Sequence, residues 1–140
     1  MEWTFELSEK PELMRITASG DFCSRQFGAM LDELISLPFW RRGIPLLFDL
    51  RKINHTEIDS LELLATSEHV VLKNRDFGFI PIAVLMETPE DLEIGKRFGQ
   101  ITGKRLLADL RGFLNESEAV QWLTSYVPAI IAVFGFSFTL

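Results

Sequence analysis

The chain has little cysteine and no surplus of basic residues. Only one of its 140 residues, Cys23, is a cysteine, so no internal disulfide can form. Fourteen lysines and arginines stand against twenty aspartates and glutamates, which gives a net charge of −6 at pH 7 and excludes a broad basic surface. The first residues also lack the basic start and apolar core of a signal peptide. We therefore expect a cytoplasmic protein that does not bind nucleic acid.

The common motifs of phosphate binding and catalysis are missing as well. Neither the GxGxxG nor the GxxxxGK[ST] spacing occurs. Neither His55 nor His69 stands at a spacing from Cys23 that indicates a nucleophile with its general base. We expect Cys23 to be a small buried residue. His55, Glu57 and Asp59 alternate in a polar stretch, but three such residues are common by chance. The sequence thus predicts no catalytic residue, no metal site and no cofactor, and hence a protein that is not an enzyme.

The start of the chain has the pattern of a β-hairpin. Trp3, Phe5 and Leu7 alternate with polar residues, which is the period of a strand with one buried face, and this predicts a strand over about 2–8. A proline-containing turn and a second apolar stretch at 13–18 follow. We therefore expect an antiparallel hairpin at one edge of a sheet.

Helices and strands alternate after the hairpin. A first helix begins at Ser24, with Ser24 or Asp21 as its cap, and ends at Pro38. Its apolar stripe consists of Phe27, Met30, Leu31, Leu34 and Ile35. The later segments are a nearly unbroken apolar strand at 45–50, a helix at 58–74, a strand at 79–86, a helix at 88–103, a strand within 106–113 and a short helix at 119–123. This order predicts an α/β fold with a mixed, mostly parallel five-stranded sheet, an antiparallel edge hairpin and about four helices.

Local signals at the helix ends add detail to this prediction. Thr88, followed by proline, and Asn115, followed three residues later by glutamate, are typical N-caps. Gly103 is expected to end its helix in a left-handed conformation. The helix over 58–74 has a broad apolar face that we expect to be buried, formed by Leu61, Leu64, Ala65 and Leu72.

Three short segments of this pattern are more distinctive than the rest. They are Gly20-Asp21-Phe22, Leu47-Phe48-Asp49-Leu50 and the stretch at 113–123 with its Glu-Ala and Trp-Leu pairs. Together with the order of elements they resemble the SpoIIAA-like proteins of the STAS-like fold group over about 2–123. The resemblance implies that residues 1–126 form one domain. It also implies a homodimer, which is common among these proteins, and no established catalytic residues. It therefore implies a non-catalytic regulatory module that binds another protein, whose identity is unknown.

The resemblance also implies a candidate regulatory residue. Anti-sigma-factor antagonists of the wider group carry a phosphorylatable serine in an Asp-Ser dipeptide where the helix after the central strand begins. Ser60, preceded by aspartate, stands at a similar place and is the candidate phosphoacceptor; the alternative is that it only caps the helix. The candidate partner-contact loop around it contains Arg51, Lys52, His55, Thr56 and Asp59.

The end of the chain is an apolar tail at 127–140 without a charged residue. At this length it is too short to span a bilayer. We expect it to pack on the domain or within a dimer, because an exposed apolar segment promotes aggregation. The tail and the relation of the fold group to lipid-binding Sec14-like domains give an alternative function, the binding of an apolar, lipid-like small molecule.

Overall fold

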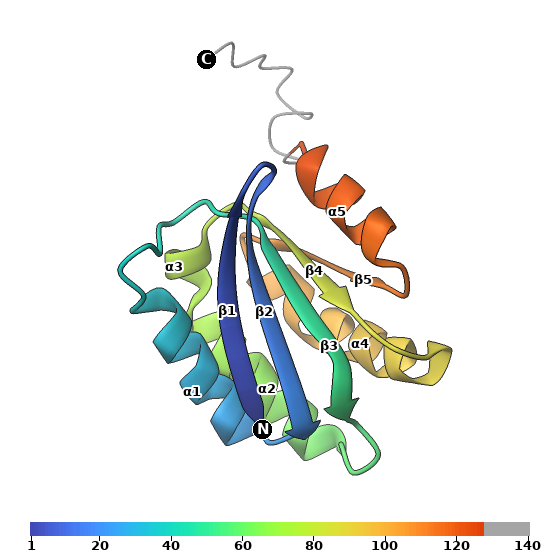
Figure 1. Cartoon of the computed structure of the whole chain (residues 1–140). Helices are drawn as coiled ribbons and strands as arrows, with labels where there is room; N and C mark the ends of the chain where they lie inside the picture. The colour runs from blue at the N-terminus through green and yellow to red at the C-terminus, as the bar shows by residue number, and fades with distance from the viewer. Residues whose placement is uncertain (128–140) are drawn as a thin grey trace.

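A computed structural model describes residues 1–127 of the chain (Figure 1). Apart from Val127, the predicted tail lies outside the described residues. The elements in chain order are β1 (Glu2–Glu9), β2 (Glu12–Asp21), α1 (Ser24–Ile35), β3 (Leu46–Asn54), α2 (Ser60–Leu72), α3 (Asn74–Phe77), β4 (Pro81–Leu85), α4 (Pro89–Thr102), the 3₁₀ turn η1 (Gly103–Arg105), β5 (Asp109–Phe113) and α5 (Glu116–Thr124).

The strands form one five-stranded sheet in the order β1-β2-β3-β4-β5. β1 and β2 are antiparallel, with Phe5 opposite Ile16, and the other neighbouring strands are parallel. The predicted mixed sheet with its edge hairpin is therefore confirmed. β3 lies in the middle of the sheet, where packing on both faces explains its nearly unbroken apolar run.

The described part of the chain contains five helices rather than about four. The helix predicted over 58–74 is divided, because Lys73 leaves the helical conformation (φ −95°, ψ 6°) between α2 and the four-residue helix α3. The side chain of Asn74, at the start of α3, accepts a hydrogen bond from the backbone nitrogen of Leu107 at 2.7 Å. This contact fixes α3 to the segment that precedes β5.

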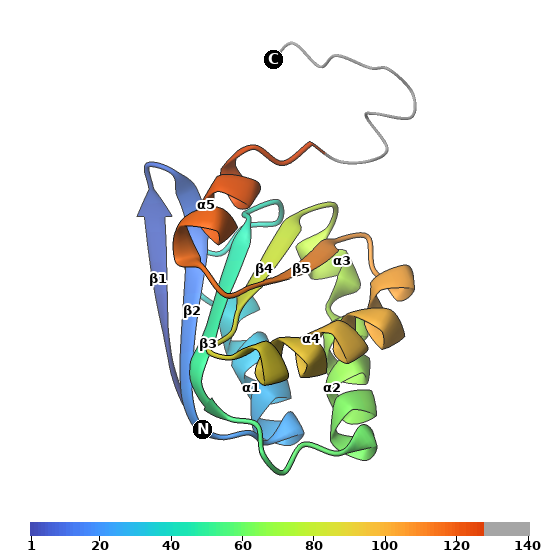
Figure 2. The same ribbon diagram turned by 90° about the vertical axis from the view of Figure 1, so that its right-hand side faces the viewer.

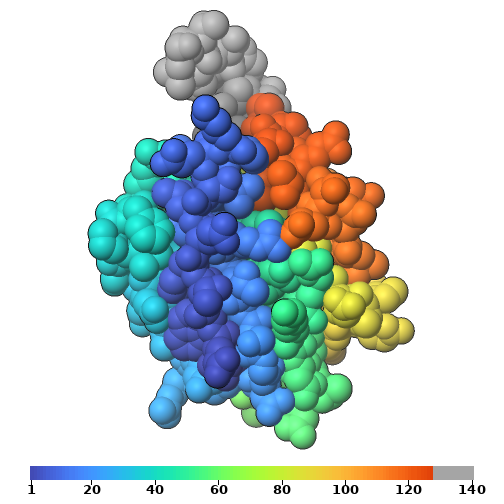
Figure 3. Space-filling model, viewed as in Figure 1, coloured from blue at the N-terminus to red at the C-terminus, as the bar shows by residue number. Residues whose placement is uncertain are grey.

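Helices cover the two faces of the sheet unequally (Figure 2). α1, α2 and α4 lie over one face, which carries the main hydrophobic core, whereas among the described elements only α5 packs on the other. The hairpin strands stay open on the α5 side, as Figure 3 shows. Thr4 and Glu6 of β1 are exposed, whereas Trp3 and Phe5, which alternate with them, are partly buried against the main core.

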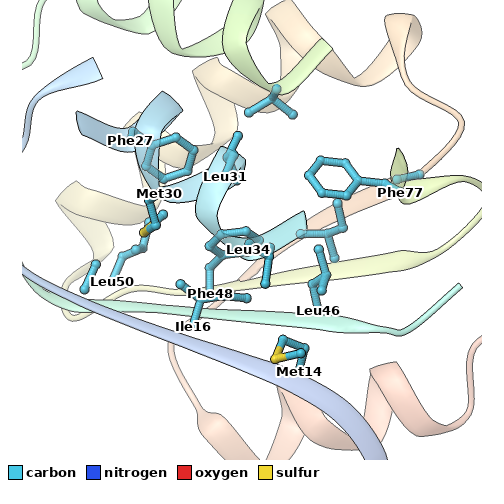
Figure 4. Packing of buried hydrophobic residues seen from close by; sticks show 14 of the residues in the cluster. Met14, Ile16, Phe27, Met30, Leu31, Leu34, Leu46, Phe48, Leu50 and Phe77 are labelled. Atoms are coloured by element: carbon cyan, nitrogen blue, oxygen red, sulfur yellow. The ribbon is translucent and has the colours of Figure 1, made fainter. Parts of the chain in front are cut away.

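The stripe predicted for α1 forms the centre of the main core. Phe27, Met30, Leu31 and Leu34 are buried and face residues of β2 and β3 such as Ile16 (Figure 4). Ile35, the last residue of the stripe, is only partly buried. The spacing in the sequence therefore correctly predicted which side of α1 packs on the sheet.

The buried face predicted for α2 is wrong. Leu61, Leu64 and Leu72 are 76%, 48% and 73% exposed. Apolar residues surround most of this helix, so their spacing does not select one face, and contacts with neighbouring helices decide which side is buried. One such contact is the hydrogen bond from Thr102 Oγ1 of α4 to Ser67 Oγ at 2.8 Å. The buried residues of α2 are Leu63, Thr66, Ser67 and Val70.

The predicted helix caps are partly confirmed. Thr88 and Asn115 accept hydrogen bonds from the third residue after them, as expected. The prediction for α1 is wrong, because its N-cap makes no side-chain bond and Glu62 of α2 instead accepts from the backbone nitrogen of Ser24 at 3.0 Å. Gly103 is right-handed (φ −57°), since the chain continues there into the tighter turn η1.

Candidate functional site

A cavity of about 690 Å³ lies between the sheet and the helices α1, α2 and α4. Its wall is mostly apolar, and its volume falls within the roughly 300–1,000 Å³ that is typical of small-molecule sites. The wall includes residues of β3, β4 and α2 and the residue that follows β4; they are Phe48, Leu50, Val84, Leu63, Val70 and Met86.

Helix α4 and the first residue of η1 contribute backbone surface to the cavity wall. Gly95, Gly99 and Gly103 recur at every fourth residue, and all three line the cavity. A Cβ atom at Gly99 or Gly103 would meet no described atom within 4 Å, and one at Gly95 would lie 3.3 Å from Cε of Met86. A helix does not need glycine, which costs it about 1 kcal/mol per residue relative to alanine. Gly99 and Gly103 therefore leave room beside the backbone.

His55 is a polar residue of the cavity wall. It follows the last residue of β3, is 5% exposed and lines the cavity wall. Its Nε2 atom lies 3.4 Å from the backbone oxygen of Leu50. Its Nδ1 atom is buried and has no hydrogen-bond partner within residues 1–127. A buried nitrogen without a partner is unfavourable by about 1–3 kcal/mol.

Charged residues of α4 and β5 are also part of the cavity wall. Lys96 is exposed and contacts Glu93 at 3.1 Å. The side chains of Arg111 and Asp109 lie on the α5 side of the sheet, because the guanidinium of Arg111 lies 5.3 Å from the centre of the Phe113 ring and Asp109 accepts a hydrogen bond from the hydroxyl of Tyr126. These two residues therefore contribute backbone, and not charge, to the cavity wall.

A separate cluster of charges lies on the opposite face of the sheet. Asp49 contacts Nη2 of both Arg15 and Arg51 at 2.8 Å, and Glu116 at the start of α5 contacts both arginines. Burial raises the pKa of Asp49, but the hydrogen bonds from Arg51 and Arg15 outweigh this effect and lower the pKa to about 2. Two cations balance two anions, so the cluster joins α5 to the sheet.

The sequence analysis assigned no functional role to Asp49, to Gly95 and Gly99 of α4 or to Gly103 of η1. Asp49 interrupts the otherwise apolar strand 45–50, and a charge at such a position is a sign of a buried partner. The repeated interval of four residues between Gly95, Gly99 and Gly103 was also visible in the sequence. What they contact could not be read from it, because their neighbours come from distant parts of the chain.

The structure places the residues of the predicted partner-contact loop in different surroundings. Arg51 belongs to the charge cluster, whereas His55 lies in the wall of the cavity. Lys52 is exposed, and the backbone nitrogen and hydroxyl of Thr56 bond to the side chain of Asn54. A role of this loop in binding a partner stays a prediction.

Asp59, and not Ser60, caps α2. The Oδ1 atom of Asp59 accepts a hydrogen bond from the backbone nitrogen of Glu62 at 2.9 Å, and Ser60 is the first, exposed residue of the helix. The alternative that Ser60 serves as the cap is therefore wrong, because the carboxylate of Asp59 already accepts the hydrogen bond of the free backbone nitrogen of Glu62. Phosphorylation of Ser60 stays a prediction.

The remaining sequence candidates are placed as follows. Within residues 1–127, no three or more His, Cys, Asp or Glu side chains are grouped as metal ligands, and this includes His55, Glu57 and Asp59. Cys23 is partly rather than fully buried. No helix in the same range is both long and apolar enough to cross a membrane.

Comparison with models of known protein families finds no match, and comparison with curated proteins finds none either. Among solved structures, the chain is similar to an uncharacterized protein of the DUF3478 family from Shewanella loihica PV-4, which is described as having a SpoIIAA-like fold. The similarity has a TM-score of 0.57 and covers 87% of this chain and 92% of that one, at 13% sequence identity. The chain therefore has the SpoIIAA-like fold that the sequence predicted.

Proposed function

We propose that this domain is a non-catalytic binding protein that holds an apolar small molecule between its sheet and the helices α1, α2 and α4. The observation that carries the proposal is the cavity of about 690 Å³ with its largely apolar wall. Protein interiors are close-packed and contain few voids larger than a water molecule. A space of this size beside the core is therefore expected to hold a ligand.

The polar groups of the cavity support binding rather than catalysis. His55 is the buried histidine of the site, and its hydrogen-bond contact within the described residues is to a backbone oxygen. General-base catalysis needs a side chain or substrate group whose proton the histidine can take, held at hydrogen-bond distance. The described side chains supply no such pair with His55, so we assign it a role in recognition.

The proposal is tested by titrating the full chain with N-phenyl-1-naphthylamine, an uncharged dye that fluoresces in apolar surroundings. The wild type is expected to bind the dye in a saturable way. Gly99→Leu places a side chain into the cavity and is expected to weaken binding at least tenfold while the thermal midpoint is maintained or raised, because leucine favours a helix more than glycine does.

Arg97→Leu is the matched control, since it introduces the same side chain at an exposed position of α4 that does not line the cavity. It is expected to bind the dye like the wild type. A wild type that does not bind the dye, or a Gly99→Leu variant that binds it with unchanged affinity, would overturn the proposal.

The regulatory, protein-binding role, the homodimer and the cytoplasmic location stay predictions beside this proposal. A regulatory role is compatible with ligand binding, because the cavity residue His55 lies in the connection between β3 and α2, and the exposed Ser60 is the first residue of α2. A ligand that contacts His55 would act directly on this loop. Sedimentation equilibrium with and without the dye would measure both the oligomeric state and any effect of the ligand on it.

A further inference from the structure

We infer that the outward face of α2 binds the same face of a second copy of this chain, as an antiparallel helix pair about a two-fold axis. Two observations carry the inference. They are a stripe of exposed leucines along α2 and a separation of opposite charges between the two ends of the helix. The surface is independent of the cavity, because none of the residues of the stripe lines the cavity wall.

The outward face of α2 carries four residues that recur at intervals of four, three and four. They are Leu61, Ala65, Glu68 and Leu72, and together they form the α2 stripe. Leu61 and Leu72 are 76% and 73% exposed, and Leu64 beside them is 48% exposed. Such intervals place side chains along one side of a helix and are typical of the seam between two packed helices. The α2 stripe is thus a seam without a partner helix in residues 1–127.

The α2 stripe matches itself when two copies of the helix run in opposite directions. Leu61 then lies opposite the partner's Leu72, and Ala65 lies opposite the partner's Glu68, because both pairs are centred on the middle of α2. The small side chain of Ala65 leaves room for Glu68, whose carboxylate contacts Arg105 of its own chain at 2.6 Å. A two-fold axis repeats each contact, so one surface supplies both halves of the interface.

The charges around the α2 stripe are separated along the helix. The segment 53–72 contains acidic residues but no lysine or arginine, and Glu57 is exposed just before α2. Arg75 of α3 and Lys104 of η1 are exposed beside the C-terminal half of α2, where these two bases outnumber Asp76. The connection from β3 and helix α3 lie at opposite ends of α2 (Figure 2). An antiparallel pair therefore brings the acidic end of each copy to the basic end of the other.

A second copy of the chain fits the α2 stripe better than a lipid surface does. A helix that lies on a membrane carries lysines and arginines along its polar flanks. The charged residues within α2 are instead Glu62 and Glu68. A single polar residue such as Glu68 in an apolar seam is also typical of paired helices, in which it helps to fix the register.

The inference is tested by sedimentation equilibrium of the full chain. The wild type is expected to have twice the 16.0 kDa mass of one chain at micromolar concentration. Leu61→Asp is expected to raise the dissociation constant of the dimer about 100-fold or more, because each dimer contains the substitution twice. The fold of the monomer is expected to persist, because Leu61 is exposed and an acidic residue is favourable in the first turn of a helix.

The matched control is Leu114→Asp, which makes the same change at an exposed leucine outside α2 and is expected to dimerise like the wild type. A charge exchange tests the orientation of the two helices. Glu57 and Arg75 are exposed and form no ion pair within residues 1–127. Glu57→Arg and Arg75→Glu are each expected to weaken the dimer about tenfold at low salt, and the double variant should restore it.

Three results would overturn the inference. The first is a wild type that is monomeric at about 100 µM; if this monomer binds phosphatidylcholine vesicles and Leu61→Asp does not, the α2 stripe contacts lipid instead. The second is a dimer that Leu61→Asp leaves intact or that Leu114→Asp weakens equally. The third is a double charge variant that dimerises no better than the single ones. None of these results depends on dye binding in the cavity, so the proposed function is tested separately.

Discussion

The charge cluster around Asp49 is expected to make the stability of the domain depend on pH in the acid range. Asp49 has 9% of its side chain exposed and is held between Arg15 and Arg51, and its pKa falls from the ordinary 3.8 to about 2. A lowered pKa stabilises the folded protein at every pH above 3.8. This contribution is lost progressively as the pH falls from about 5 through 2.

The size of the effect follows from the change in pKa. The difference between 3.8 and about 2, at about 1.4 kcal/mol per unit, corresponds to roughly 2.5 kcal/mol. Arg15 and Arg51 have 27% and 36% of their side chains exposed, so water screens part of the attraction. We therefore expect Asp49 to contribute about 2 kcal/mol that the protein loses between pH 7 and pH 2.

The assay is urea denaturation followed by far-ultraviolet circular dichroism at a series of pH values between 7 and 2. Asp49→Asn keeps the volume of the side chain but not its charge, so it is expected to lose about 2 kcal/mol less than the wild type over this range. Glu2→Gln, which alters an exposed carboxylate that forms no ion pair within residues 1–127, is the control and should follow the wild type. Identical pH profiles for the wild type and Asp49→Asn would refute the reasoning.

Two further predictions concern the helices. Asp59→Ala is expected to lower the free energy of unfolding, measured in urea, by about 1 kcal/mol, because it removes the cap of α2. Ser60→Ala should change this free energy little. A larger loss in Ser60→Ala than in Asp59→Ala would contradict the assignment of the cap. Gly28→Ala should destabilise by about 1–3 kcal/mol, since its Cβ would lie 2.6 Å from Nδ1 of His69, while Gly99→Ala, in open space, should stabilise by up to about 1 kcal/mol. Thermal unfolding of this pair checks the second prediction, and equal effects of the two substitutions would contradict it.

The functional features that the sequence analysis missed share one property, which is long separation along the chain. Arg15 and Glu116 meet at Asp49 although they are 101 residues apart. His55 was selected for a surface loop, but it is buried and lines a cavity whose wall also includes residues of α2 and α4 that come later in the chain. Side-chain surroundings of this kind depend on how separate elements pack, and no local pattern encodes them.

The amino-acid sequence by itself determined the type and order of the elements and the nature of the sheet. The alternation in 2–8, the apolar run at 45–50 and the capping residues Thr88 and Asn115 act over a few neighbouring residues, and the structure confirms them. The arrangement of the sheet then follows, because strands joined through helices are parallel and those joined by a tight turn are antiparallel.

Only the tertiary structure decided which face of α2 is buried, where His55 points and how much space remains beside α4. A helix that is apolar around most of its circumference can pack in several orientations of similar hydrophobic energy, and the neighbours Thr102 and Ser67 settle the choice. A cavity is likewise a property of packing: Gly99 leaves open space only because no side chain from another described element fills it.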